Sequence, residues 1–232
     1  MSKSVGIIGG IGPESTIIYY REIVRRFREL DKSGHYPRVI LNCIDVSELL
    51  AKVAEKKYAD VIDMLAVEIH KLELARVDYG IIGATTPHIV FDELISKVNL
   101  PLISIVEETC RAIKASGIYK IGLFGTSFTM QGDFFKNVAK RFHLDIIVPE
   151  LSEQEYIHTK YVSEFIPGIV LNETRKGLLE IATALKLRTG IGGLILGGTE
   201  LSLILKQADF PELTIFDSTL IHVESVVNRL LS

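Results

Sequence analysis

The chain has 232 residues, of which 47% are hydrophobic and 24% are charged, and its formal net charge is −3. This is the balance of an ordinary globular protein, and the length allows one large domain or two smaller ones. The charge is nearly neutral, and no cluster of Lys and Arg interleaved with aromatic residues is present, so a nucleic-acid partner is not expected.

The first residues lead directly into a short apolar run that is interrupted by glycines. Because this run is too short for a signal peptide or a membrane span, we expect a cytoplasmic protein with no membrane partner. The two cysteines, Cys43 and Cys110, lie far apart and show neither CxxC nor Cys/His spacing. The sequence therefore predicts reduced thiols, no disulfide and no metal site.

Short runs rich in β-branched residues alternate along the chain with longer stretches of helical periodicity, for example residues 57–76. Alternation of this kind predicts an α/β fold with parallel sheets that are covered by helices on both faces. The expected strands, in chain order, are residues 5–8, 39–41, 79–82, 102–103, 120–124, 146–148, 194–196 and 213–215.

Two strand-to-loop corners of the first half recur in the second half. Residues 5–9 resemble residues 121–125, and residues 82–85 resemble residues 196–199, in both cases about 115 residues later. The alternative is coincidence, because strands that end in glycine are common in α/β proteins. The repeat predicts two pseudosymmetric Rossmann-like domains, each a parallel sheet of about four strands flanked by helices.

The repeat also predicts where the two halves meet, which is near residue 98. No linker rich in Pro or Ser separates the halves, so the hinge should be short and lie within residues 98–117.

The first corner, residues 9–16, follows a strand and opens a helix. Its glycines allow close approach of a ligand to the backbone, and Ser15 or Thr16 can cap the helix. Gly10 and Thr16 are therefore candidate binding residues. The corner carries only two of the three glycines of GxGxxG, and the first acidic residue after the next strand, Asp45, comes too late for the ribose contact. A nicotinamide-dependent oxidoreductase is accordingly a weaker alternative.

The other corners are residues 83–88, 125–130 and 197–200. Each places hydroxyl and backbone N–H groups at a helix start, an arrangement suited to a carboxylate. A threonine there is more often a structural cap, but four such corners in symmetric positions favour a binding site in a cleft between the halves. The candidate substrate-binding residues are Gly10, Thr16, Asp45, Thr85, Thr86, Thr126 and Thr199.

At these residues the sequence resembles the pyridoxal-independent aspartate/glutamate racemases. The resemblance rests on the opening motif of residues 6–16, the second corner with its histidine, residues 124–126, residues 197–200 and the final motif of residues 216–222, all in the family's order. It implies a two-domain fold whose C-terminal helix packs on the first domain, so that residues 1–98 and 210–232 form the first domain and residues 99–209 the second. It also implies isomerase activity, no metal or organic cofactor, and a homodimer.

The resemblance also implies a mechanism in which two cysteines face opposite sides of the substrate Cα; one thiolate removes the proton and the other thiol supplies one. The matching positions here are Ala84 and Gly198, and neither side chain carries a proton. The two-thiol mechanism is therefore not possible with this sequence. The remaining candidates for catalysis are His88, Glu200, Asp45 and Thr85, although the resemblance gives the histidine and the glutamate an orienting role. Cys43 is a further, weaker candidate.

Two hypotheses remain beside the oxidoreductase. In the first, the chain is a racemase-like isomerase that acts on a small acidic amino acid or dicarboxylate by altered chemistry. In the second, it is a catalytically silent homologue that binds the same ligands through the retained threonines.

Overall fold

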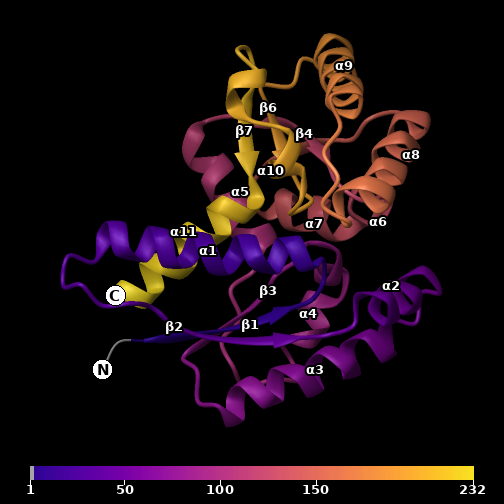
Figure 1. Cartoon of the computed structure of the whole chain (residues 1–232). Helices are drawn as coiled ribbons and strands as arrows, with labels where there is room; N and C mark the ends of the chain where they lie inside the picture. Colours follow the sequence, from indigo (N-terminus) through magenta and orange to yellow (C-terminus); the bar gives the residue numbers. More distant parts are fainter. Residues whose placement is uncertain (1–2) are drawn as a thin grey trace. The chain divides into compact units, whose positions relative to one another are not determined.

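The computed structural model describes residues 3–232. The chain divides into two compact units: one ends at Ile105 and is completed by His222–Ser232, and the other is Val106–Ile221. Both consist of strands that alternate with helices (Figure 1). No helix within residues 3–232 is long and apolar enough to cross a membrane.

The first unit contains a parallel three-stranded sheet in the order β2-β1-β3. Its elements are β1 (Ser4–Gly9), α1 (Pro13–Leu30), β2 (Arg38–Cys43), α2 (Val46–Ala54), α3 (Tyr58–Leu74), β3 (Tyr79–Ile82), the 3-10 helix η1 (Thr86–Val90) and α4 (Phe91–Leu94).

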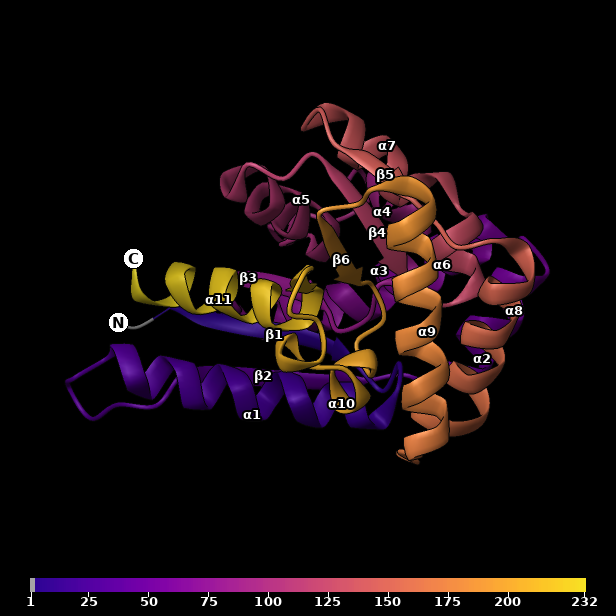
Figure 2. The same ribbon diagram turned by 90° about the horizontal axis from the view of Figure 1, so that it is seen from above.

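Both faces of this sheet are covered by helices. On one face, α1 and the C-terminal part of α11 (Ser218–Leu231) bury a shared core against β1 and β3, as Figures 1 and 2 show. On the other face a Cβ atom at Gly6 would lie 2.7 Å from Leu72 of α3. The predicted apolar stripe of α3 is confirmed, because Val61, Leu65, Ile69 and Leu72 are buried. The C-terminal helix thus packs on the first unit, as the resemblance implied.

The second unit contains a parallel four-stranded sheet in the order β5-β4-β6-β7. Its elements are α5 (Ile105–Ser116), β4 (Lys120–Phe124), α6 (Ser127–Gln131), α7 (Asp133–Arg141), β5 (Asp145–Ile147), α8 (Leu151–Lys160), the π-helical turn η2 (Tyr161–Phe165), α9 (Asn172–Thr189), β6 (Gly193–Leu196), α10 (Leu201–Ile204), the 3-10 helix η3 (Gln207–Asp209), β7 (Thr214–Asp217) and the start of α11.

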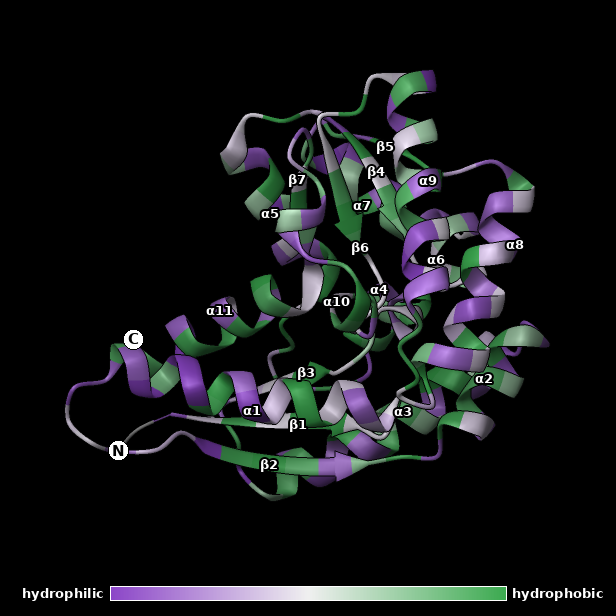
Figure 3. Cartoon of the chain, turned by 45° about the horizontal axis from the view of Figure 1, so that its top comes forward, coloured by the Kyte–Doolittle hydropathy of each residue, from purple (hydrophilic) through white to green (hydrophobic). Residues whose placement is uncertain are grey.

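The core of this unit lies between the sheet and the helices α8 and α9, which run side by side (Figures 1 and 2). Figure 3 shows that both helices carry hydrophobic as well as hydrophilic residues, as expected for helices with one buried face.

The two sheets share one strand order, because β2-β1-β3 corresponds to β5-β4-β6. The predicted α/β fold with parallel sheets is confirmed. The prediction of a strand at residues 102–103 was wrong: Leu102 forms only an isolated parallel bridge to Gly80. Its place corresponds to that of β7, but Pro101 precedes it and α5 begins at Ile105, so no room remains for a longer strand.

Candidate functional site

The first corner, at the end of β1, is held together by two hydroxyl groups. Thr16 Oγ1 accepts a hydrogen bond from the Gly10 amide at 2.8 Å and donates one to the Gly12 carbonyl at 3.3 Å. Ser15 Oγ donates to the carbonyl of Gly83 at 2.7 Å and so joins this corner to the one after β3. The N-cap of α1 is Gly12 and has no side-chain cap, so the expected capping by Ser15 or Thr16 is not observed.

Gly10 fits this loop because no side chain could replace its hydrogen. Its φ is +76°, and a Cβ atom would lie 2.4 Å from the carbonyl oxygen of Ile44. Since its amide already donates to Thr16, that amide is not free to hold a phosphate. This observation argues against a dinucleotide at the first corner.

The end of β2 supplies two further residues that the sequence singled out. Asp45 is exposed and caps α2, accepting a hydrogen bond from the Ser47 amide at 2.8 Å. Cys43 is the last residue of β2 and is exposed, whereas Cys110 is buried, and burial raises the pKa of its thiol to about 12. Of the two cysteines, only Cys43 has the exposure that a reactive thiol requires.

The second corner follows β3 and is buried throughout. Ala84, Thr85 and His88 are 6%, 3% and 3% exposed. Nδ1 of His88 lies 3.0 Å from the carbonyl oxygen of Ala84. Because a carbonyl can only accept, Nδ1 carries the hydrogen and Nε2 is left with a lone pair. Thr86 begins η1 beside these residues and is also buried.

Two atoms of this corner have no hydrogen-bond partner within residues 3–232: Oγ1 of Thr85 and Nε2 of His88. Burial, and after it the neighbouring His222, lowers the pKa of His88 to about 3, so the ring is neutral at pH 7 and accepts hydrogen bonds through Nε2. The ring stacks on Phe91 with a centroid distance of 4.8 Å, which fixes its plane. A buried polar atom without a partner costs about 1–3 kcal/mol, so these two atoms are the candidates at this corner for contact with a ligand.

His222 of α11 is the second buried histidine of the first unit, and its hydrogen bonds are complete. Nε2 donates to the Ile103 carbonyl at 2.9 Å, so Nδ1 accepts from the hydroxyl of Tyr19 at 2.8 Å. Burial lowers its pKa to about 4. Since both ring nitrogens are used, His222 has a structural role between α1, α11 and residue 103.

In the second unit, Thr126 follows β4 and caps α6. Its Oγ1 accepts from the Thr129 amide at 3.3 Å and lies 3.2 Å from the Thr129 hydroxyl. The capping role predicted for a threonine at a helix start is observed here.

The fourth corner follows β6 and contains Gly198, Thr199 and Glu200, all buried. Oε2 of Glu200 accepts hydrogen bonds from the hydroxyl of Tyr161 and, at 2.7 Å, from the hydroxyl of Thr199. Tyr161 is the first residue of η2 and is 5% exposed. Burial, and after it the negative charge of Glu200, raises the pKa of this phenol well above its usual value, so it stays protonated.

Tyr161 and Thr219 are not among the site residues predicted from the sequence. Thr219 lies after β7, is 1% exposed, and its Oγ1 has no partner within residues 3–232. Its position after a strand, like that of Thr85, was the signal that could have identified it. Tyr161 lies in a helical segment with no comparable signal.

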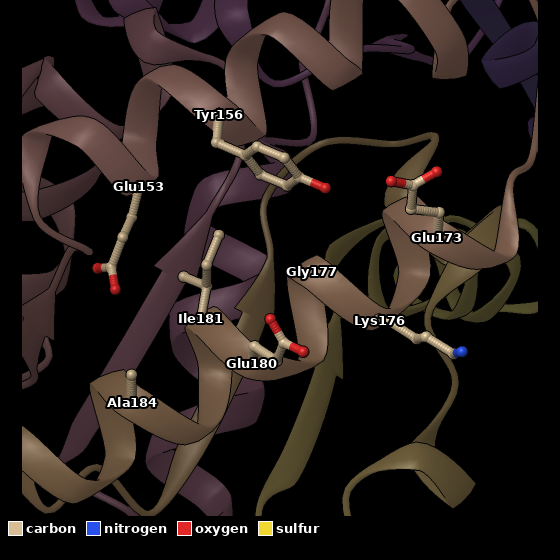
Figure 4. A pocket seen from close by; sticks show the side chains of 8 residues that line it. All are labelled: Glu153, Tyr156, Glu173, Lys176, Gly177, Glu180, Ile181 and Ala184. Carbon is tan, nitrogen blue, oxygen red and sulfur yellow. The ribbon is translucent and has the colours of Figure 1, made fainter.

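A separate hollow lies on the surface of α8 and α9 (Figure 4). Tyr156 of α8 and Glu173, Lys176 and Glu180 of α9 line part of it. It contains none of the predicted site residues. Within residues 3–232, no group of three or more His, Cys, Asp or Glu side chains is placed to hold a metal ion.

The chain matches a known protein family and is similar to several known proteins. Residues 8–226 match the model of the Asp/Glu/hydantoin racemase family. A curated relative, the broad-specificity amino-acid racemase RacX of Bacillus subtilis, is 26% identical over 140 residues, which cover 59% of this chain and 60% of RacX.

Solved structures resemble the chain over nearly its whole length. A protein from Yersinia pestis, provisionally assigned as an Asp/Glu racemase, has a TM-score of 0.90 at 28% identity and covers 99% of this chain and 100% of its own. An aspartate racemase homologue from Pyrococcus horikoshii has a TM-score of 0.86 at 30% identity, with the same coverage. A glutamate racemase from Francisella tularensis, solved in complex with D-glutamate, shares the fold with a TM-score of 0.67 at 14% identity, over 99% of this chain and 81% of that one.

Proposed function

Because the chain belongs to the Asp/Glu/hydantoin racemase family, we propose that it binds a small acidic amino acid or dicarboxylate and acts on it as a racemase-like isomerase by chemistry other than the two-thiol scheme. The observation that carries this proposal is the pair of buried atoms without partners, Thr85 Oγ1 and His88 Nε2, beside Ala84.

The two atoms differ in what they require of a ligand. Nε2 of neutral His88 accepts a hydrogen bond, which an ammonium or hydroxyl group can donate. The Thr85 hydroxyl can donate to a carboxylate. An α-amino acid supplies both partners on neighbouring atoms, so it would relieve both unmet hydrogen-bonding needs at once.

In this proposal the ligand lies outside the carboxyl ends of the parallel strands. The support is topological, since both sheets are parallel with one strand order, and ligands of parallel α/β sheets bind outside the carboxyl ends of the strands. Gly10, Thr16, Asp45, Thr86, Thr126 and Thr199 are then proposed as the surrounding binding and supporting residues.

For the chemical step, His88 is the proposed proton acceptor of the first unit, because Ala84 cannot carry a proton. Its Nδ1 is bound to the Ala84 carbonyl, so Nε2 would take the Cα proton, in a complex in which the ligand's ammonium group does not already donate to that atom. The burial that lowers its pKa makes free His88 a weak base. A bound carboxylate would raise that pKa, because a nearby negative charge favours the imidazolium form. In the second unit Glu200, with its two hydroxyl donors, is the proposed orienting group.

The test is proton exchange at Cα. The protein is incubated with the L- and D-forms of aspartate and glutamate in deuterated water, and the Cα–H signal is followed by NMR. We expect a slow loss of signal that is abolished in His88→Gln and retained in His35→Gln, which changes an exposed histidine. No exchange above background by the unmodified protein rejects isomerisation of these substrates.

The second candidate is a silent homologue that binds small carboxylates. It is favoured by the retained hydroxyls beside positions that have lost their thiols. A ligand at 100 times its Kd stabilises by about 2.7 kcal/mol, so thermal denaturation with aspartate, glutamate, malate and succinate measures binding without turnover. Stabilisation without exchange identifies the silent homologue, and no stabilisation rejects both candidates for these ligands.

We further propose, from the resemblance, that the protein is a cytoplasmic homodimer that needs no cofactor. Light scattering during size-exclusion chromatography measures the mass directly, and a value of one chain mass would reject the dimer.

A further inference from the structure

Gly198 stands where the resemblance puts the second thiol, and its neighbourhood leaves no room for a side chain. A Cβ atom at this position would lie 2.3 Å from Cε2, 2.8 Å from Cζ and 2.8 Å from the hydroxyl oxygen of Tyr161. Real Cβ atoms essentially never approach other heavy atoms so closely. The ring and hydroxyl of Tyr161 therefore occupy the volume that the side chain of residue 198 would fill.

The position of Tyr161 is strongly constrained. Its hydroxyl donates to Glu200 Oε2 and accepts from the Glu200 amide at 3.3 Å, and its ring packs edge-on against Phe165 at 5.8 Å. The π-helical turn that carries it is fixed to α9 by Glu164, which accepts from the Thr174 hydroxyl at 2.6 Å. Single π turns are frequent at functional sites.

We propose that Tyr161 replaces the missing side chain of residue 198 and determines the chemistry of the fourth corner. Its ring excludes a thiol, and its hydroxyl, held by Glu200, provides a phenol–carboxylate pair in the place of that thiol. The assignment of the replaced thiol rests on the proposed function, whereas the exclusion of a side chain rests on the local geometry alone.

The polarity of this pair follows from its hydrogen bonds. The phenol gives its hydrogen to Glu200 Oε2, and its oxygen accepts from the Glu200 amide, so the hydroxyl is engaged both as donor and as acceptor within the corner. A thiolate can take a proton from carbon, which a neutral phenol oxygen cannot do. The fourth corner thus supplies no base in the place of the thiol.

A double-mutant cycle tests the exclusion without any need for activity. Gly198→Ala, Tyr161→Ala and the combined variant are compared by thermal denaturation. Gly198→Ala alone should lower Tm by roughly 5 °C. Overpacking costs about 1–3 kcal/mol, and in a chain of this size each kcal/mol lowers Tm by about 2–4 °C. In the Tyr161→Ala background the same change should lower Tm by less than about 1 °C.

Two controls make this result specific. Tyr161→Phe keeps the ring, so Gly198→Ala should remain costly in that background. Gly192→Ala lies in the same unit, where the nearest atom to a new Cβ is Ile118 Cγ2 at 3.3 Å, and it should have a small effect in every background. Equal costs of Gly198→Ala with and without the Tyr161 ring would overturn the proposal.

The functional consequence is tested by restoring both thiols. Ala84→Cys with Gly198→Cys should show no gain of Cα exchange with aspartate or glutamate, and addition of Tyr161→Ala should produce it. Exchange in the double variant would overturn the exclusion of a thiol by Tyr161. A different result would overturn the proposed function instead. In that case the stability cycle shows that residues 161 and 198 are coupled, but the triple variant shows no Cα exchange, so the thiols are inactive even where Tyr161 no longer fills the space.

Discussion

The two buried histidines of the first unit should make the protein sensitive to mild acid. Burial is the main cause that lowers the pKa of His88 to about 3 and of His222 to about 4, from 6.5 in an unfolded chain. Below pH 6.5 the unfolded chain takes up a proton at each site and the folded chain does not. The contribution of these histidines to the free energy of unfolding is therefore fully present above pH 6.5, and it is lost as the pH falls towards their pKa values in the folded chain.

The magnitude follows from the width of this window. A pH of 5 lies about 1.5 units below the pKa of a histidine in the unfolded chain. Each of these units stabilises the protonated unfolded state by about 1.36 kcal/mol per histidine. Each histidine then removes about 2 kcal/mol, so the first unit should lose about 4 kcal/mol between pH 7.5 and pH 5. The half-buried His158 of the second unit, whose pKa is also lowered by burial, adds a change in the same direction.

Urea denaturation at pH 7.5, 6 and 5 measures this dependence. His88→Gln removes one titrating group, so its stability should fall by about 2 kcal/mol less than that of the unmodified protein over the same range. His35→Gln, at an exposed position, should leave the pH dependence unchanged. Identical pH dependences for His88→Gln and the unmodified protein, or an NMR titration of His88 with a midpoint near 6.5, would refute the reasoning.

Two further predictions concern the first unit and the cysteines. Gly10→Ala should destabilise by more than about 2 kcal/mol, because the new Cβ meets the Ile44 carbonyl, whereas Gly34→Ala, at a similar positive φ with no atom within 4 Å, should cost only about 1 kcal/mol in urea denaturation. A thiol reagent at pH 7 should label the exposed Cys43 of the folded chain but label Cys110 only after denaturation, and rapid labelling of both in the folded chain would contradict the burial of Cys110.

The parts of the fold that depend on local patterns were predictable from the sequence. Glycine-ended apolar runs and helical periodicity gave the alternation of strands and helices, and Thr126 caps its helix as a threonine in that position should. Residues 102–103 carry the same strand pattern as the others. These residues form only an isolated bridge because α5 begins at Ile105, and the pattern of residues 102–103 does not predict where that helix begins.

The parts that depend on distant contacts were not predictable. Thr16 has the sequence position of a ligand-binding hydroxyl, yet its bonds close the loop around Gly10. The unpartnered state of His88 Nε2 appears only when every neighbour is placed. The Tyr161 ring occupies the space beside Gly198 that a side chain at residue 198 would take. Tyr161 comes 37 residues earlier in the sequence, so no local sequence pattern connects the two.

The two positions at which the resemblance places thiols, Ala84 and Gly198, differ in physical terms. At Ala84 the neighbouring Thr85 and His88 each have a buried polar atom without a partner among residues 3–232, and a ligand could provide that partner. At Gly198 the volume is filled by Tyr161, and the Glu200 carboxylate already accepts two hydroxyl groups. In the second unit, the buried hydroxyl oxygen of Thr219, shortly after the end of β7, has no hydrogen-bond partner within residues 3–232. If the ligand is an amino acid, the energetic contribution of the second corner to its recognition should therefore exceed that of the fourth, and substitution of His88 should weaken binding more than substitution of Thr199.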